Sequence, residues 1–251
     1  MSLLKENLEI LKTRFPEVYE ALSKSSPSGN IRFLPARNGA PIPYERQGSR
    51  EGPLHSAVAP QREGERALKI VGEAGFVLCY GLGAGYHLSR LVLDERREIL
   101  LLVDGAERLL AFLSGADLRP ILASPRLGLI LDPEPRRIKE AIWGRYLPGL
   151  HGSFASLSLA GIQAQRRERI AEINRIAQEA LAKVKSDYSV QAHFGRIWTR
   201  NCLANLGLLN PEIQASQTEA VAALDRNLTV VLVGAGPSLT ENLERIERER
   251  R

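Results

Sequence analysis

Residues 75–85 read Gly-Phe-Val-Leu-Cys-Tyr-Gly-Leu-Gly-Ala-Gly, an apolar run that ends in a glycine-rich turn. Two more apolar runs follow, at 98–106 and 126–132. Strands without polar alternation, separated by helices, are typical of a parallel sheet that is covered on both faces. The sequence therefore predicts an α/β fold with a Rossmann-like, mostly parallel sheet. Its expected helices lie at 86–93, 107–112 and 136–143.

The region before this domain has a mixed pattern. Apolar residues at helical spacing predict a helix over 3–14, and Pro16 begins a second one. Short strands are expected at 31–35 and 41–45, separated by an Asn-Gly turn. We expect a polar surface loop from Arg46 to Gly52 and then a helix from Pro60 to Val71.

The region after the domain is helical. From 158 to about 207 the pattern predicts two long helices, with breakers near Ser186. These helices are candidates for an interdomain contact or a homo-oligomer contact. A strand, a glycine turn and a helix then follow, as at the start of a second α/β domain. The expected division is 1–53 for the N-terminal helices and strands, 54–157 for the Rossmann-like domain, 158–226 for the helical connector and 227–251 for the truncated start of a central domain.

Composition excludes several classes of protein. The chain has 251 residues, 44% of them hydrophobic, but no apolar run long enough to span a bilayer. The N-terminus lacks a signal-peptide pattern, so we expect a cytoplasmic protein without a membrane partner. Acids interleave with the bases that give the net charge of +5, which argues against a nucleic-acid partner. Cys79 and Cys202 are expected to be reduced core residues.

The first glycine turn has the chemistry of a nucleoside site. Gly81, Gly83 and Gly85 stand where a strand meets an expected helix, whose free N–H groups suit an anion. Asp104 ends the next apolar run, where a carboxylate could accept hydrogen bonds from ribose hydroxyls. The Gly-x-Gly-x-Gly spacing also occurs in methyltransferases, and S-adenosylmethionine is the ligand of that alternative. A purely structural turn is the other interpretation.

The second glycine turn is Gly234-Ala-Gly236-Pro237-Ser238. Pro237 suits the first position of a helix, and the hydroxyl of Ser238 stands beside free N–H groups. Together they make a phosphate-sized site. Gly234, Gly236, Pro237 and Ser238 are therefore candidate nucleotide-binding residues, against the alternative of a structural turn.

The sequence offers no metal site and no catalytic residue that can be named. The histidines at 55, 87, 151 and 193 lack the spacing of a helical metal site, and we expect them at the surface or at its boundary. There is no nucleophile elbow and no phosphate-binding loop with its lysine.

Four separated stretches together resemble the motility-associated factor (Maf) flagellin glycosyltransferase-like family, which shares a domain with MptE-like 6-hydroxymethylpterin diphosphokinases. The stretches are Leu54-His55-Ser56 with Pro60, Glu63 and Arg66; Gly81 to His87; Trp198 to Asn201 with Asn205; and Val233 to Leu239. They span residues 54–251 in the order and spacing of the family.

The resemblance implies a nucleotide-dependent transferase in the full-length form. In Maf proteins the central domain is thought to use a CMP-activated nonulosonic sugar to modify flagellin, and MptE-like enzymes transfer diphosphate from ATP. A nucleotide or CMP-sugar is thus the implied cofactor, and flagellin an implied partner. The family's later acidic motifs do not follow in this sequence, so we expect the segment itself not to be catalytic. The alternatives are a methyltransferase-like protein that uses Gly81, Gly83, Gly85 and Asp104, and a non-catalytic dimerisation module whose surface includes Trp198 and Leu203.

Overall fold

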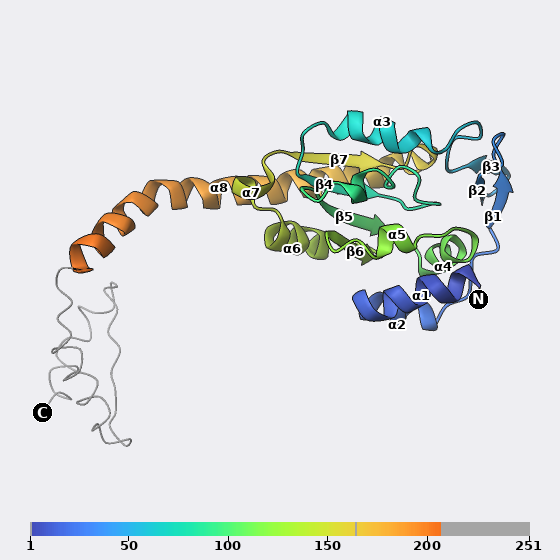
Figure 1. Ribbon diagram of the computed structural model, residues 1–251, viewed down its shortest axis with the longest axis horizontal. Coiled ribbons are helices and arrows are strands. Elements are labelled where there is room, and N and C mark those ends of the chain that lie inside the picture. The colour runs from blue at the N-terminus through green and yellow to red at the C-terminus, as the bar shows by residue number, and fades with distance from the viewer. Residues whose placement is uncertain (1, 164, 207–251) are drawn as a thin grey trace, which may run out of the picture. The chain divides into compact units, whose positions relative to one another are not determined.

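The computed structural model describes residues 2–163 and 165–206 (Figure 1). The chain divides into two units, residues 1–189 and 190–251, and each is described by itself. The second turn, with Gly234, Gly236, Pro237 and Ser238, lies outside the described residues, as does the expected start of a central domain.

The first unit is built on a parallel four-stranded sheet, which confirms the α/β fold. Its strands are β4 (Phe76–Tyr80), β5 (Glu98–Val103), β6 (Leu127–Leu131) and β7 (Phe154–Ser158). They lie in the order β6-β5-β4-β7, and each neighbouring pair is parallel. The first three strands are the three apolar runs of the sequence. The sequence pattern did not predict β7, because most of its short side chains are only half-buried.

The three predicted strands form the centre of the core. Every residue of β4 and of β6 is buried, as is all of β5 except Glu98. Helices supply the rest of the core, because parallel strands need crossover segments and these cover the faces of the sheet. The crossover and connecting helices are α3 (Arg62–Val71), α4 (Ala106–Gly115), α5 (Arg119–Leu122), α6 (Pro135–Arg145) and α7 (Pro148–His151).

An N-terminal layer precedes the sheet. Helices α1 (Leu3–Arg14) and α2 (Pro16–Ser23) pack against α4, as Figure 1 shows. The side-chain amide of Asn7 donates hydrogen bonds to two carbonyl groups near the end of α4, at 2.8 Å each, and its oxygen accepts one from the Leu118 N–H. This buried amide fixes α1 on the Rossmann-type domain.

A small antiparallel sheet follows α2. It has the order β1 (Ile31–Pro35), β2 (Pro41–Gln47) and β3 (Arg50–Pro53). The expectation of a surface loop from Arg46 to Gly52 was wrong, because β3 pairs with the end of β2. Gly48 closes that hairpin with a φ of +60°, a conformation that glycine adopts without strain.

The helix expected over 86–93 was also wrong. The chain after the first glycine turn runs through consecutive turns, and only η1 (Leu91–Leu93) is helical, of the 3₁₀ type. Helix α3 leaves no room for a regular helix there: a side chain at Gly64 would come within about 3 Å of Ser89 and Arg90.

The long C-terminal helix is continuous where two helices were expected. Helix α8 (Arg167–Leu206) follows the short η2 (Ala160–Ile162) and passes through Ser186 without a break. Its N-terminal half buries one face against the sheet and α6, through Ile173, Ile176, Ala177, Ala180 and Val184. In the second unit, the large apolar side chains from Val190 to Leu206 are exposed.

Within the described residues, no helix has the length and apolar character needed to cross a membrane.

Candidate functional site

The connectivity of the sheet defines where a ligand would enter. The chain moves from β4 to β5 and β6 on one side and returns to β7 on the other, so β4 and β7 flank a topological switch point. In open α/β sheets, ligands bind in the crevice outside the carboxyl ends of the strands at such a point. The first glycine turn follows β4 at this edge, and η2 follows β7.

The first glycine turn is closed by the chain itself. Gly81, Gly83 and Gly85 have φ values of +91°, +56° and +76°, so each has a conformation that favours glycine. Side chains of the same chain occupy the space beside each of them. A Cβ at Gly81 would lie 2.7 Å from Ile162, and Cβ atoms at Gly83 and Gly85 would lie closer than 3.0 Å to His55 and Ile121. The protein's own side chains therefore fill the space beside these glycines. A dinucleotide would need that space to be empty in order to approach the backbone.

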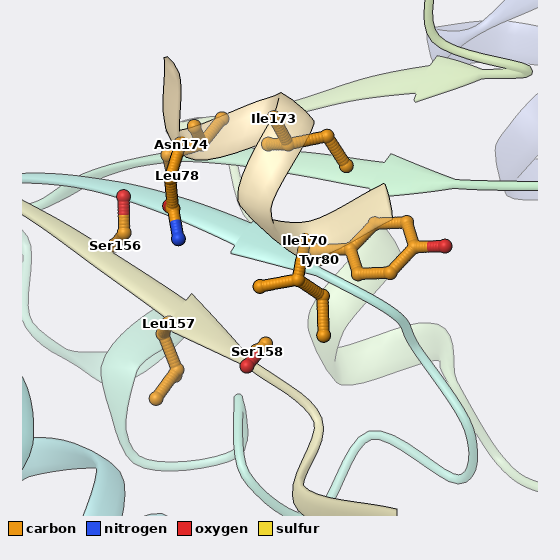
Figure 2. Close-up of a pocket in the computed structure, with 8 residues that line it drawn as sticks. All are labelled: Leu78, Tyr80, Ser156, Leu157, Ser158, Ile170, Ile173 and Asn174. Atoms are coloured by element: carbon orange, nitrogen blue, oxygen red, sulfur yellow. The ribbon is translucent and has the colours of Figure 1, made fainter. Parts of the chain in front are cut away.

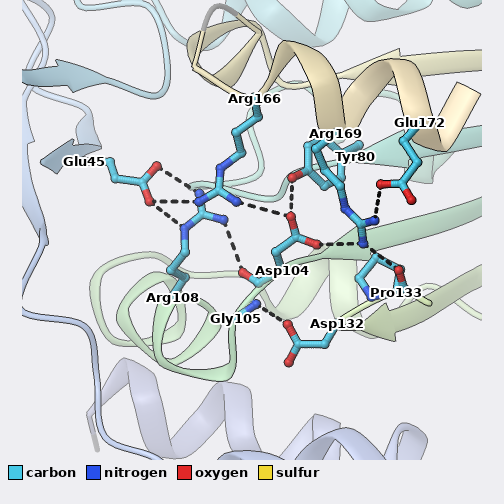
Figure 3. Close-up of polar contacts among 10 residues, drawn as sticks. All are labelled: Glu45, Tyr80, Asp104, Gly105, Arg108, Asp132, Pro133, Arg166, Arg169 and Glu172. Atoms are coloured by element: carbon cyan, nitrogen blue, oxygen red, sulfur yellow. Dashed lines mark hydrogen bonds and ion pairs between the residues drawn. The ribbon is translucent and has the colours of Figure 1, made fainter. Parts of the chain in front are cut away.

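Asp104 lies at the same edge, after β5, but its carboxylate is already engaged (Figure 3). It accepts hydrogen bonds from the Tyr80 hydroxyl and from Arg166, the latter at 3.2 Å, and Arg169 forms an ion pair with it at 3.6 Å. The expected ribose acceptor is thus paired with two arginines at the start of α8.

The two arginines belong to a larger cluster, the Asp104 cluster, shown in Figure 3. Glu45 on β2 pairs with Arg108 at 2.6 Å and with Arg166 at 3.6 Å, and its side chain is only 5% exposed. Arg169 pairs with Glu172 at 2.8 Å. Three cations therefore face three carboxylates, and the cluster ties the small antiparallel sheet, the edge of the parallel sheet and α8 together.

Tyr80 is buried at this edge of the sheet. Burial, reinforced by its hydrogen bond to Asp104, raises the pKa of Tyr80 from 10.0 to about 12. The hydroxyl therefore remains a donor to the carboxylate throughout the neutral range. Directly after β6, Asp132 accepts a hydrogen bond of 2.6 Å from the Gly105 N–H.

A second cluster lies on the other side of the glycine turn and is built on His55. The Ala84 N–H donates to Nε2 of His55 at 2.9 Å, so the ring proton sits on Nδ1. Nδ1 then donates to the Glu63 carboxylate at 2.5 Å, and the other oxygen of Glu63 accepts from the Ser56 N–H at 2.5 Å. The chain of bonds joins α3 to the loop before it and to the glycine turn.

His87 also belongs to this cluster, and one of its ring nitrogens has no hydrogen-bond partner among the described residues. Its Nε2 lies 3.1 Å from the Gly81 carbonyl oxygen, which can only accept, so Nε2 carries the proton. Its Nδ1 is a buried acceptor without a hydrogen bond among the described residues. Burial, reinforced by the nearby His55, lowers the pKa of His87 from 6.5 to about 3. His87 is therefore neutral at physiological pH.

A cavity of about 430 Å³ lies beside this cluster. Its polar wall comes from His55, Glu63, Arg66 and His87, and its apolar wall from α3 and the end of β7. Residues 54–56, 63, 66 and 87, which belong to two of the stretches that carry the family resemblance, thus line one cavity. The expectation that the histidines lie at the surface was wrong for His55 and His87, which are 3% and 5% exposed, and for His151, which is also buried.

A much smaller cavity, of about 50 Å³, lies on the α8 side of the sheet (Figure 2). Side chains from β4, β7 and α8 line it, among them Tyr80, Ser156 and Asn174. It has room for water but not for a cofactor.

Only part of these sites could be predicted from the sequence. Gly81, Gly83, Gly85 and Asp104 were singled out, and the structure places them at one sheet edge. The pairing of Asp104 with Arg166 and the proximity of His55 to His87 were missed, because both join segments remote in the sequence. The placement of His55, Glu63, Arg66 and His87 within conspicuous motifs was the one available signal.

The fold and the site define an α/β protein with a parallel Rossmann-type sheet and a cavity at its switch point. No protein-family model matches the chain, and no solved structure matches it. The chain is similar to an uncharacterised protein of Treponema pallidum (strain Nichols), with 29% identity over 140 residues. That match covers 55% of this chain and 63% of the Treponema protein.

Proposed function

We propose that this chain is the N-terminal part of a Maf/MptE-like protein, a cytoplasmic nucleotide-dependent transferase. In this proposal, the turn from Gly234 to Ser238 receives the phosphates of the nucleotide. The Rossmann-type domain binds or positions a substrate. The supporting observation is the convergence of residues 54–56, Glu63, Arg66 and His87 on one cavity. Motif residues that are dispersed in the sequence and gathered in space are expected of a shared ligand site.

The surroundings of the first glycine turn support the proposal that the second turn, not the first, binds the phosphates. His55, Ile121 and Ile162 fill the space beside its glycines, and two arginines pair with the carboxylate of Asp104. A dinucleotide or S-adenosylmethionine in the usual position would have to displace all of these groups. The phosphate-binding role therefore passes to the second turn, at Gly236 and Ser238.

The reaction proposed for the full-length protein is transfer of an activated group. With a CMP-activated nonulosonic sugar, a Ser or Thr hydroxyl of flagellin forms the new glycosidic bond, the bond from sugar to phosphate breaks, CMP leaves and the hydroxyl proton is released. Diphosphate transfer from ATP is the alternative within the same proposal. In both reactions the nucleotide phosphates need backbone N–H donors, which a glycine turn at a helix start supplies.

Replacing Gly236 with valine is expected to weaken binding of CMP and ATP about tenfold or more, because a branched side chain blocks phosphate from the turn. Isothermal titration of the 251-residue chain measures this change. Gly144→Val is the matched control, since Gly144 is exposed and has no atom within 4 Å of an added Cβ. Equal nucleotide affinity in wild type and Gly236→Val would contradict the proposal.

A second candidate function, contact between two copies of the chain, is favoured by the C-terminal part of α8. Val190, Phe194, Ile197 and Trp198 are 51%, 41%, 40% and 55% exposed. Their spacing of three and four residues places them on one face of the helix. We propose that this face pairs with the same face of a second copy, because two apolar helix faces bury each other well.

Light scattering is expected to give twice the 27.7 kDa mass of one chain. The double change Phe194→Ser and Trp198→Ser should return the mass to that of a single chain, since it removes the aromatic pair from the contact. Leu203→Ser is the control. Leu203 was expected in the same surface as Trp198 and is also exposed, but it lies two and a half turns beyond Phe194 and so on the opposite face of the helix. A wild-type mass equal to that of one chain would exclude this contact.

A further inference from the structure

The cavity beside His87 occupies the position where the fold binds small molecules. It is lined by residues from both sides of the switch point: His87 after β4, and Leu157, Ser158 and Gly161 at and after the end of β7. Its volume of about 430 Å³ lies within the range of ligand sites in proteins. It is separate from the Asp104 cluster, with which it shares no lining residue.

The inner wall of the cavity offers acceptors. His87 lines the cavity, and its buried Nδ1 has no hydrogen-bond partner in the described part of the chain. A buried acceptor left unpaired costs about 1–3 kcal/mol, and a ligand donor recovers that cost. Ligand-type atoms of His55, Glu63 and His87 lie within 4.8 Å of one another. One amino group with two N–H donors can therefore reach both the carboxylate and the His87 ring.

A metal ion suits these three residues poorly. Both nitrogens of His55 are engaged, since Nε2 accepts from Ala84 and Nδ1 donates to Glu63. Coordination through Nδ1 would move the proton to Nε2, which would then face the Ala84 N–H, donor against donor. Only Glu63 and His87 would remain as ligands, fewer than the three or four that protein zinc sites use.

The outer part of the cavity offers cations and apolar surface. Arg66 lines it and is exposed, and no ion pair of Arg66 is found within the described ranges. An adjoining open groove shares Ser158 and Ala160 with the cavity and adds Arg167, another exposed arginine. Leu54, Ala67 and Ile70 supply apolar lining of the cavity.

We propose that this cavity binds a nucleoside monophosphate whose base carries an amino group. The amino group donates to His87 and Glu63, the base packs on the apolar wall, and the phosphate meets Arg66 and Arg167. Adenine and cytosine share this amino group, whereas hypoxanthine and uracil carry a carbonyl oxygen in its place, which would face two acceptors. The inference does not depend on the transferase activity or on the turn at Gly236.

Isothermal titration of the 251-residue chain with AMP, IMP, CMP and UMP tests the proposal. We expect AMP to bind at least about tenfold more tightly than IMP, or CMP at least about tenfold more tightly than UMP, because an unpaired buried acceptor costs roughly 1–3 kcal/mol. The pair that shows the difference identifies the base as a purine or a pyrimidine. Equal affinity within both pairs, or no binding by AMP and CMP, would overturn the proposal.

Two variants locate the site. Arg66→Ala changes an exposed side chain and should weaken the nucleotide about tenfold while leaving the affinity for the free nucleoside unchanged, since only the phosphate contact is lost. Ala67→Phe fills the cavity and should abolish binding of both, with circular dichroism as the check on folding. Free adenosine and cytidine have no phosphate to place at the Gly236 turn, so Gly236→Val should leave their affinities unchanged, which separates this site from the transferase proposal. Unchanged nucleotide affinity in Arg66→Ala would refute the site, as would Zn²⁺ that raises the melting temperature of wild type but not of His87→Phe.

Discussion

Replacing Gly83 with alanine is expected to lower the free energy of unfolding of the Rossmann-type unit by about 2–6 kcal/mol. Two costs add together. A φ of +56° strains a residue other than glycine by about 1–3 kcal/mol. The new Cβ would also lie closer than 3.0 Å to the His55 ring, and overpacking costs about 1–3 kcal/mol. At about 2–4 °C per kcal/mol, the melting temperature should fall by roughly 4–24 °C, as calorimetry would show.

Gly39→Ala separates the two costs. Gly39 has a φ of +81° but no atom within 4 Å of an added Cβ, so its replacement meets only the backbone strain. We expect a loss of about 1–2 kcal/mol there. If the two variants lose the same stability, the close approach of His55 to the turn is wrong.

Acid is expected to destabilise the fold through His87. Burial lowers the pKa of His87 from 6.5 to about 3, so below pH 6.5 the unfolded chain binds a proton that the folded chain does not. The stability that neutral His87 contributes is complete above pH 6.5 and is lost as the pH falls through about 3. A shift of this size corresponds to roughly 4–5 kcal/mol. Urea unfolding at a series of pH values measures it.

His87→Gln provides the comparison, since glutamine can still donate to the Gly81 carbonyl but does not titrate. Carboxylates contribute to acid unfolding in both proteins, so the difference between their pH profiles isolates the histidine. Wild type should be the more stable near neutral pH, and its advantage should shrink as the pH falls. The nearby Glu63 carboxylate favours protonated His87, but it is already paired with His55. Parallel profiles would show that His87 is not held neutral by burial.

The strands of the Rossmann-type sheet could be predicted from local pattern, and the path after the first glycine turn could not. Strands β4, β5 and β6 are continuous apolar runs because both of their faces are covered. Each run can be recognised from its own short stretch of sequence. Leu88 and Leu91 have helical spacing, yet the close approach of α3 at Gly64 imposes turns on this segment. The approaching helix comes from elsewhere in the sequence, so local spacing could not reveal it.

Weak local signals explain the other differences. Strand β3 reads Arg-Glu-Gly-Pro, a composition typical of a loop, and becomes a strand only because β2 offers it a partner. Ser186 was interpreted as a break, but a single serine costs a helix little, and α8 passes through it.

The candidate site, too, could be predicted from the sequence only in part. The glycines of the first turn and Asp104 could be placed at one sheet edge, because parallel strands end together there. What these residues contact could not be predicted. Arg166 reaches Asp104 across 62 positions, and Ala84 meets His55 across 29, and each contact depends on where a whole element packs.

The two cysteines have opposite surroundings. Cys79 lies within β4 with no exposed surface, and burial raises the pKa of its thiol well above the usual range. Cys202 was expected in the core as well, but it lies exposed on α8. The thiolate is the form that reacts with alkylating reagents, so the folded protein presents one nucleophilic sulfur to solvent. A maleimide dye or spin label can thus be attached at position 202 of the unmodified sequence, beside the helix face proposed to pair two copies.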